Sequence, residues 1–336
     1  MPASASSYSL IHNFTGADGQ QPSGALVADS AGRLYGTTFQ GGQQGGGSVF
    51  RLTKVGGTWN EEVLYSFVGS SGVRGGVLIG PSGELYGTTV IGGAAAGGTV
   101  WRLDPNGSTW TLTTLHTFNP VGGKDGYYPN AGLVFGKDGL LYGTTMGQPP
   151  QDGEQPTQSP MYGTVFSVSP NGDGVEYALL HVFGGPNDGQ FPGWGRLLVD
   201  NKGVLTGTTE LGGTLSSGTA FRLAPPKKSR ATWSETVLHN FGATGDAVGP
   251  FTGLVRGLDG ASYGCAAWGK NGFGAVYSLT STGEQVLYNF GDQAGDPSAA
   301  SSCAVTVDAT GTLYGTATSG GANSKGAVFK VTPPAE

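Results

Sequence analysis

Arginine and aromatic residues at irregular positions are the part of this 336-residue chain best suited to chemistry. Arg74, Arg196 and Arg256 each stand where equivalent segments of the chain carry other residue types. An arginine can stabilise the negative charge that develops on a carbonyl oxygen during a reaction. We therefore predict these three arginines as catalytic residues.

Ten further residues complete the predicted site, and most of them are aromatic. We expect them at the starts of strands, at the ends of neighbouring strands or in the loops between, all on one face of the molecule. The predicted substrate-binding residues are Phe39, Tyr127, Tyr128, Asn130, Met146, Phe191, Trp194, Glu210, Phe251 and Trp268. Such a site is an apolar cup with few carboxylates and no histidine. It favours a small apolar or aromatic substrate, since burial of apolar surface contributes about 25 cal/mol per Å².

The four histidines are predicted to be structural. All of them occupy one position of a repeated segment, which tyrosine fills in the other two copies. A general base is needed only once, so four copies indicate packing and hydrogen bonding instead. These residues are His12, His116, His181 and His239.

Aspartates recur beside glycines in five copies of the same segment, and two interpretations are open. Five carboxylates around a ring could hold a hard cation. Alternatively, each aspartate bonds the backbone of its own turn. We favour the turn and predict neither a metal nor a cofactor. The aspartates are Asp18, Asp125, Asp188, Asp246 and Asp296.

A repeat that covers the whole chain must position these residues. The motif Tyr35–Thr38 recurs with its first residue at Tyr86, Tyr142, Thr206, Tyr263 and Tyr314, at intervals of 51, 56, 64, 57 and 51 residues. Each copy contains short apolar runs of strand length, bounded by Gly, Pro, Asn or Asp. Several strands in a repeat of this length are typical of propellers. We predict an all-β, six-bladed β-propeller with four antiparallel strands in each blade.

The two ends of the chain hold complementary parts of one unit. Residues 8–14 match the fourth apolar run of the other copies, whereas the last copy, 303–331, stops after its third run. We predict that the N-terminal strand completes this last blade, because closure removes the open edge of the array. Residues 1–336 then form a single propeller domain, with first strands at the axis and fourth strands outermost.

Cys265 and Cys303 are expected to be small core residues. Cys265 replaces the first threonine of its YGTT motif, and Cys303 stands where other copies carry Gly or Ala. Two cysteines do not make a disulfide framework. An unpaired cysteine commonly packs as a small apolar residue.

One loop of the repeat is much longer than its counterparts. The connection between the second and third runs spans 39–47 in the first copy but 146–163 in the third, where it is rich in Pro and Gln. We predict that this insertion forms a lid or rim over a pocket at the axis. A disordered surface insertion is the alternative.

Composition narrows the class of partner. The chain has 64 glycines, only 12% charged residues and a net charge of -6, with its Lys and Arg scattered, which argues against nucleic-acid binding. No apolar stretch approaches the roughly 18 residues of a membrane span. We expect a soluble monomer that binds neither nucleic acid nor membrane. Asn13–Thr15 and Asn106–Ser108 match the glycosylation sequon, so secretion with a leader absent from this chain stays open.

The repeat resembles the GloVer family of tandem-repeat proteins. The resemblance rests on a Gly-Leu-Val element, as in Gly132–Val134 and Gly253–Val255, followed by the YGTT strand and a Gly-Gly-rich loop. It covers essentially the whole chain and implies a fold more than an activity. The fungal hetero-Diels–Alderases, which are similar in their propeller-like, all-β character, join a tropolone-derived quinone methide to a sesquiterpene. This analogy is at the level of the fold and carries over no catalytic residue.

The predicted cup suits such a cycloaddition. Two apolar partners must be held face to face, and orientation alone can lower a barrier by about 7 to 11 kcal/mol in favourable cases. We therefore predict a cofactor-free cyclase of natural-product biosynthesis. It would perform a hetero-Diels–Alder cycloaddition of a quinone-methide-type heterodiene with a terpene alkene, as in meroterpenoid formation.

A secreted glycan-binding protein or a polysaccharide lyase is the alternative. Aromatic rings can stack on sugar faces, and a lyase could use Tyr127 or Tyr128 as a base beside Arg196. The candidate residues differ from copy to copy, which favours one central site over six peripheral sites. A cell-surface scaffold without a small-molecule site is a third interpretation.

Overall fold

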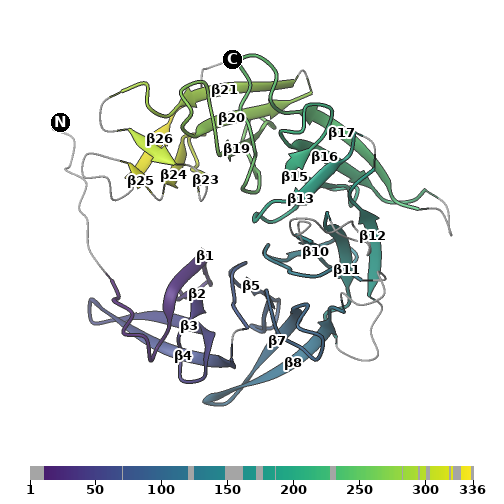
Figure 1. Cartoon of the computed structure of the whole chain (residues 1–336). Helices are drawn as coiled ribbons and strands as arrows, with labels where there is room; N and C mark the ends of the chain where they lie inside the picture. Colours follow the sequence, from purple (N-terminus) through teal and green to yellow (C-terminus); the bar gives the residue numbers. More distant parts are fainter. Residues whose placement is uncertain are drawn as a thin grey trace.

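Six antiparallel sheets surround a central axis in the computed structural model of the chain (Figure 1). The structure describes residues 11–69, 71–119, 125–147, 162–171, 177–185, 187–227, 232–281, 283–293, 296–299, 303–317, 319–320 and 327–333. All elements named within these ranges are β-strands. The predicted six-bladed, all-β propeller is confirmed.

The blades follow one another in sequence order. Blade 1 contains β1 (Gln20–Ala28), β2 (Leu34–Gln40), β3 (Gly45–Val55) and β4 (Thr58–Val68). Blade 2 contains β5 (Leu78–Ile79), β6 (Leu85–Thr89), β7 (Thr99–Asn106) and β8 (Thr109–Thr117). Blade 3 contains β9 (Val134–Phe135), β10 (Leu141–Thr145), β11 (Thr164–Val168) and β12 (Ala178–Val182).

The second half of the chain repeats this plan with small changes. Blade 4 contains β13 (Gly189–Pro192), β14 (Leu198–Val199), β15 (Leu205–Gly212), β16 (Thr219–Ala224) and β17 (Ser234–Asn240), with β13 and β14 both pairing with β15. Blade 5 contains β18 (Val255–Arg256), β19 (Ser262–Ala266), β20 (Ala275–Thr280) and β21 (Gly283–Asn289). Blade 6 contains β23 (Ala304–Val307), β24 (Leu313–Ala317) and β26 (Ala327–Val331), and a separate pair joins β22 (Pro297–Ala299) to β25 (Ser319–Gly320).

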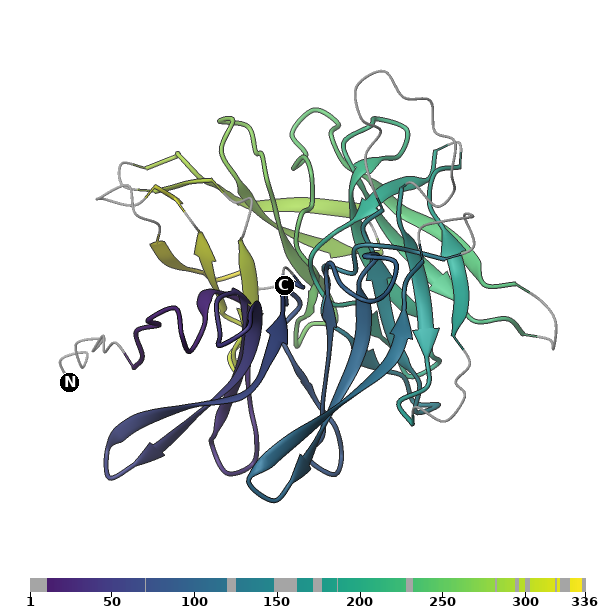
Figure 2. The ribbon, with the colours of Figure 1, turned by 60° about the horizontal axis from the view of Figure 1, so that its bottom comes forward.

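The strand order within a blade fixes which loops meet at each end of the propeller. First strands lie nearest the axis and fourth strands lie outermost (Figure 1). The hairpins between third and fourth strands, such as β3–β4 and β7–β8, extend together to one end (Figure 2). Because the strands alternate in direction, the loops that enter each first strand and those between second and third strands lie at the opposite end.

The glycine of the YGTT motif explains how the blades pack. A Cβ atom on Gly207 would lie 2.7 Å from the ring of Phe221, which is fully buried on the adjacent strand β16. The glycine therefore lets an aromatic ring cover the second strand. Phe183, from the preceding blade, then packs edge-on against Phe221 with ring centroids 5.1 Å apart. The same pairing joins Phe67 to Trp101, Phe118 to Phe166, Phe241 to Tyr277, and Phe290 to Phe329.

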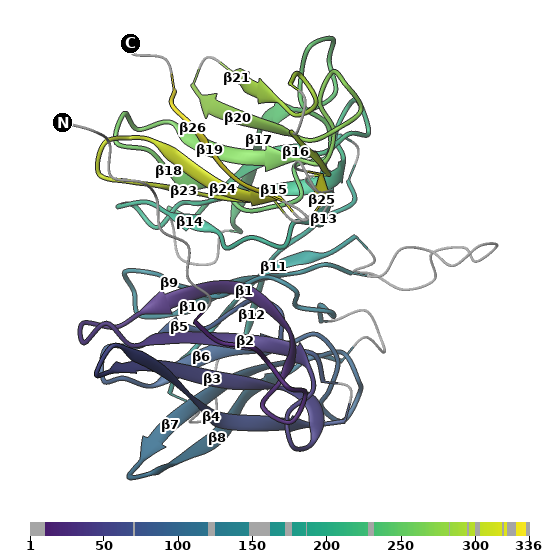
Figure 3. The same ribbon diagram turned by 90° about the vertical axis from the view of Figure 1, so that its left-hand side faces the viewer.

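The junction between blade 6 and blade 1 carries this contact as well. The rings of Phe14 and Phe50 lie 5.0 Å apart in the edge-on arrangement that recurs at the other junctions. Blade 6 also lies beside blade 1 in two views (Figures 1 and 3). Residues 1–10 lie outside the described residues, and 11–14 belong to no strand. Pairing of residues 8–14 with blade 6 therefore stays a prediction, although Phe14 occupies the place that this prediction requires.

The expectation for the two cysteines is wrong, because Cys265 and Cys303 form a disulfide. Both are fully buried and connect β19 of blade 5 to the residue preceding β23 of blade 6. At two other junctions the equivalent contact is a hydrogen bond from the first YGTT threonine to the next blade. Thr88 donates to the carbonyl of Ala131, and Thr208 donates to that of Thr252. The disulfide thus replaces a hydrogen bond between blades with a covalent bond.

The described residues include no helix with the length and apolar character that crossing a membrane requires.

Candidate functional site at the mouth of the axis

Arg74 lies between two aromatic rings contributed by different blades. Its guanidinium carbon is 4.2 Å from the ring centroid of Phe39 and 4.5 Å from that of Trp194. Phe39 lies in β2 of blade 1, Arg74 precedes β5 of blade 2, and Trp194 follows β13 of blade 4. The structure therefore brings together three predicted residues that are far apart in the sequence. We call this group, extended by Phe251, the axial cup.

The backbone explains how these rings reach the axis. Gly72 has a φ of +62°, and a Cβ atom there would lie 2.6 Å from the Phe39 ring. A side chain at this position would therefore displace Phe39. On the other side of Arg74, the backbone N–H of Trp194 donates to the backbone carbonyl of Phe251 at 2.9 Å, and the centroids of their rings lie 5.5 Å apart. Two hub contacts, one of them a backbone hydrogen bond, thus fix the walls around Arg74.

The positive charge of Arg74 has no ion-pair partner among the residues that the structure describes. No carboxylate of the described residues lies within ion-pairing distance of Arg74, and burial lowers the pKa of its guanidinium. The indole Nε1 of Trp194 is buried without a hydrogen-bond partner. Buried polar groups are normally paired. A partly desolvated cation and an unpaired donor together fit a ligand with an oxygen acceptor and a flat face.

Asn130 and Met146 lie close together in blade 3. The Asn130 side-chain nitrogen is 3.0 Å from the Met146 sulfur, and its amide oxygen is buried without a partner. Ala131, the next residue, packs against the backbone of Gly75, directly after Arg74. The backbone that follows Asn130 therefore runs close to the backbone that follows Arg74, while the printed side-chain contact of Asn130 is with Met146.

Arg196 lies within the hub and bonds to the protein itself. Its Nη2 donates to the carbonyl of Val77 at 2.5 Å, which links blade 4 to blade 2. Gly76 and Gly132 leave room for its side chain, since a Cβ atom on Gly132 would lie 2.6 Å from the Arg196 Nε. Burial lowers the pKa of this guanidinium. Arg196 therefore fills the axis between first strands and acts as a structural bridge in this arrangement.

Tyr127 and Tyr128 pair with each other on the loop that enters blade 3, whereas Phe191 lies in β13 of blade 4 and pairs with a different tyrosine. The rings of Tyr127 and Tyr128 lie 5.3 Å apart, and Phe191 lies 5.7 Å from Tyr162. Tyr128 and Phe191 have φ values of 59° and 57°. Such values are unusual for bulky residues and are held here by the surrounding structure.

Glu210 and Trp268 lie at the same end of the propeller. Glu210 is in β15, where β13 pairs alongside, and burial raises the pKa of its carboxyl. Trp268 is 48% exposed and joins Val248 through two backbone hydrogen bonds. Trp268 therefore belongs to the rim of blade 5.

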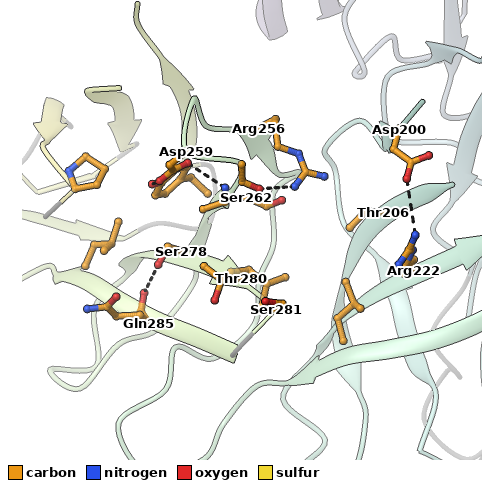
Figure 4. A pocket seen from close by; sticks show the side chains of 17 residues that line it. Asp200, Thr206, Arg222, Arg256, Asp259, Ser262, Ser278, Thr280, Ser281 and Gln285 are labelled. Atoms are coloured by element: carbon orange, nitrogen blue, oxygen red, sulfur yellow. Dashed lines mark hydrogen bonds and ion pairs between the residues drawn. The ribbon is translucent and has the colours of Figure 1, made fainter. Parts of the chain in front are cut away.

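Arg256 lies at the other end of its strand and is not brought to Arg74. Its Nη1 donates to the carbonyl of Gly260 at 2.8 Å in the turn between β18 and β19. It lines a different cavity, of about 770 Å³, between blades 4 and 5 (Figure 4). Sequence analysis missed this cavity, although Thr206 at a tyrosine position of the repeat was a signal for it. Of the predicted lid, 146–163, residues 148–161 lie outside the described residues, so the lid stays a prediction.

The histidine and aspartate positions form one repeated pair. The four histidines place Nε2 between 2.9 and 3.2 Å from an aspartate Oδ2. Each aspartate also accepts backbone N–H groups of its turn, as Asp18 does from Thr15 at 2.8 Å. The predicted structural role of both residue types is confirmed. Two of these pairs have a glutamate close enough to form a group of possible metal ligands: Glu61 lies beside His12 and Asp18, and Glu284 lies beside His239 and Asp246, with ligand-type atoms within 4.8 Å of one another. In both groups the histidine and the aspartate already bond to each other.

The repeat itself identifies the family. The family model of the Gloeobacter/Verrucomicrobia repeat matches residues 1–221 and 199–336. The chain belongs to this repeat family. No match was found among curated proteins.

Solved structures similar to this member of the repeat family share its fold at low sequence identity. One is a putative oxidoreductase (glucose dehydrogenase) from Thermus thermophilus, with a TM-score of 0.50 and 17% identity over 94% of this chain and 98% of that chain. A puromycin-hydrolyzing peptidase from Mycobacterium tuberculosis has a TM-score of 0.53 and 13% identity over 90% of this chain and 44% of that chain. A protein of unknown function from Dyadobacter fermentans has a TM-score of 0.52 and 12% identity, covering 92% and 93%. At these identities the likeness concerns the fold alone.

Proposed function

We propose that the axial cup binds a flat, conjugated carbonyl compound and that the protein is a cofactor-free cyclase. The observation that carries this proposal is the guanidinium of Arg74 between the rings of Phe39 and Trp194, with no ion-pair partner in the part of the chain that the structure describes. Its N–H groups can donate to a carbonyl oxygen, while the rings offer a flat apolar face. Two of the similar propellers are described as enzymes, which is compatible with catalysis on this fold.

The reaction proposed is a hetero-Diels–Alder cycloaddition between a quinone-methide-type heterodiene and a terpene alkene. The heterodiene oxygen and its terminal carbon each form one bond to an alkene carbon. Three π bonds become two σ bonds and one π bond, so no atom leaves and no oxidant or reductant is needed. Arg74 would stabilise the charge that shifts onto the heterodiene oxygen. The aromatic walls would hold the two partners face to face.

The lyase alternative receives less support from the geometry. It requires Arg196 beside a tyrosine base, whereas the Arg196 guanidinium donates to the Val77 carbonyl within the hub. The glycan-binding alternative would be favoured by one binding group per blade, but the cup draws on different residue types from blades 1, 2, 4 and 5.

Two measurements test the proposal. The first is quenching of tryptophan fluorescence by 2-hydroxy-1,4-naphthoquinone, a flat carbonyl compound. Arg74→Ala should weaken binding about 10- to 100-fold, because a hydrogen bond to a charged group contributes about 1.5 to 3 kcal/mol. Arg33→Ala is the matched control, since Arg33 pairs with Asp29 at the surface. Equal affinity in both variants would remove Arg74 from the site.

The second measurement is adduct formation from a quinone methide generated in situ and humulene, followed by mass spectrometry. The protein should accelerate the reaction, Arg74→Ala should lose most of this acceleration, and Arg256→Ala should retain it. Adduct formation at the rate seen in buffer would refute the cyclase assignment.

A further inference from the structure

The cavity lined by residues of blades 4 and 5 includes the one position of the repeat at which the YGTT tyrosine is missing. The YGTT tyrosines of blades 1, 2, 3 and 5 are buried and pack into the hydrophobic cluster of the next blade. Tyr86, for example, lies edge-on against Phe135 with ring centroids 5.4 Å apart. Blade 4 has Thr206 at this position, and the cluster at its junction contains no such tyrosine among the described residues. Thr206 instead lines the cavity of about 770 Å³.

The facing residue of the same junction has also changed. Strand register places Arg256 where Phe135 stands in blade 3, since Arg256 pairs with Ser262 and Phe135 pairs with Leu141. An aromatic pair of one junction is thus replaced by a threonine and an arginine at another. The two substitutions remove a ring and add a positive charge at the same place.

The aspartate that normally accepts the tyrosine hydroxyl remains. The hydroxyl of Tyr35 donates to Asp29 at 3.1 Å, and that of Tyr142 donates to Asp138 at 2.6 Å. The residue of blade 4 at the position of Asp29 is Asp200, whose Oδ1 accepts two turn N–H groups. Its Oδ2 has only a loose ion pair with Arg222, at 3.8 Å. An acceptor for a phenol hydroxyl is therefore present without the phenol.

Arg222 and Arg256 bring two guanidinium groups to the cavity, which Asp200 and Asp259 also line. Arg222 pairs in register with Thr206 across β15 and β16, and Arg256 enters from blade 5. Figure 4 shows Asp200, Arg222 and Thr206 on one wall, with Arg256 between them and the hydroxyl-bearing residues of blade 5. Arginines at such a position suit a carboxylate.

We propose that this cavity is a binding site for a phenolic carboxylic acid, separate from the axial cup. The ring of the ligand would lie in the cavity beside Thr206, with its para position turned away from the backbone of β15, because the Thr206 side chain already fills the place of the tyrosine Cβ. Its hydroxyl would donate to Asp200 Oδ2, and its carboxylate would accept hydrogen bonds from Arg222 and Arg256. The class of ligand follows from the missing side chain together with the added charge, and the cavity volume is within the usual range for small-molecule sites.

The experiment is calorimetric titration of the full chain with 4-hydroxybenzoate, with phenol and galacturonate as comparison ligands. The natural protein should bind 4-hydroxybenzoate saturably, and Arg256→Ala should weaken this binding by about tenfold or more without changing the weak binding of phenol. Thr206→Tyr restores the residue used by the other blades, so its ring should block the part of the cavity beside Asp200 and abolish binding while keeping the fold. Tyr86→Thr is the matched control. It removes the repeat tyrosine at the junction of blades 2 and 3, where Phe135 stands in place of an arginine, so it should create no site for the acid.

Three outcomes would overturn the proposal. One is absence of 4-hydroxybenzoate binding to the natural protein. A second is binding that persists unchanged in Thr206→Tyr with a native circular dichroism spectrum. The third is binding of galacturonate in preference to 4-hydroxybenzoate, which would assign the cavity to an acidic sugar. Should Thr206→Tyr fail to fold, Arg256→Phe, which restores the residue of blade 3, decides between the same outcomes.

Discussion

Replacing the Cys265–Cys303 disulfide by the hydrogen bond that other junctions use should destabilise the propeller by about 3 kcal/mol. The appropriate variant is Cys265→Thr with Cys303→Ala, because Thr88 and Ala131 occupy these positions at the junction of blades 2 and 3. The exchange leaves the packing positions filled. It therefore isolates the contribution of the covalent link between blades 5 and 6.

The magnitude follows from the length of chain that the disulfide closes. A sequence separation of 38 residues corresponds to about 4 kcal/mol in the chain-entropy description. The restored hydrogen bond returns about 1 kcal/mol. With an unfolding entropy of roughly 2.1 cal/mol/K per residue over 336 residues, the difference lowers Tm by about 4 °C if the propeller unfolds as one unit.

Differential scanning calorimetry of both proteins, with and without dithiothreitol, measures this effect. The natural protein should lose stability on reduction, whereas the Thr/Ala variant should be insensitive to the reductant. A variant as stable as the oxidised natural protein, with the reductant affecting neither, would refute the reasoning.

Three further predictions concern packing, pH and closure. Gly207→Ala should lower the free energy of unfolding, measured in urea, by about 1 to 3 kcal/mol, because the new Cβ would lie 2.7 Å from the Phe221 ring. Gly185→Ala is the control and should leave the free energy of unfolding unchanged, since the nearest neighbour of its Cβ would be 3.7 Å away. Equal losses in the two variants would contradict the packing argument. Burial, aided by a neighbouring carboxylate, raises the pKa of Glu284 to about 8, so the folded protein holds a proton that the unfolded chain loses above pH 4.5. Stability should therefore fall as pH rises from about 5 to 8, and Glu284→Gln should flatten this dependence of Tm; an unchanged slope would show that Glu284 does not titrate in this range. Phe14→Ala should lower Tm by several degrees because it removes the ring contact that the N-terminal segment makes with Phe50 of blade 1, whereas an unchanged Tm would contradict the prediction that this segment closes the ring.

The fold could be predicted because its signal is repeated six times. Each YGTT glycine is required by the ring that covers it, so the motif recurs wherever a blade packs on its predecessor. The shared position of the histidines likewise revealed their structural role. Local irregularities between blades do not affect this pattern, and the architecture therefore follows from the repeat alone.

The site was predicted less completely because strand position alone does not say where a side chain ends. Arg74, Phe39 and Trp194 were predicted on one face and do lie together, since the end of a second strand and the residues before a first strand meet at the same end of the propeller. Arg256 lies at the opposite end of its strand, and Arg196 is long enough to reach a carbonyl across the hub.

The disulfide was missed for a related reason. The contact between a second strand and the next first strand becomes visible only when adjacent blades are placed side by side. The two cysteines then occupy the positions that Thr88 and Ala131 fill elsewhere. The cavity beside Thr206 was not predicted, because one substitution at a repeat position does not by itself indicate which neighbouring residues surround the lost ring.

The most direct test of the central claim is a crystal structure of the full chain soaked with 2-hydroxy-1,4-naphthoquinone. The account predicts density for the compound at the mouth of the axis, with its ring against Phe39 or Trp194 and an oxygen within hydrogen-bonding distance of Arg74. An empty mouth with the compound bound elsewhere, or Arg74 paired with a protein carboxylate in the crystal, would contradict it.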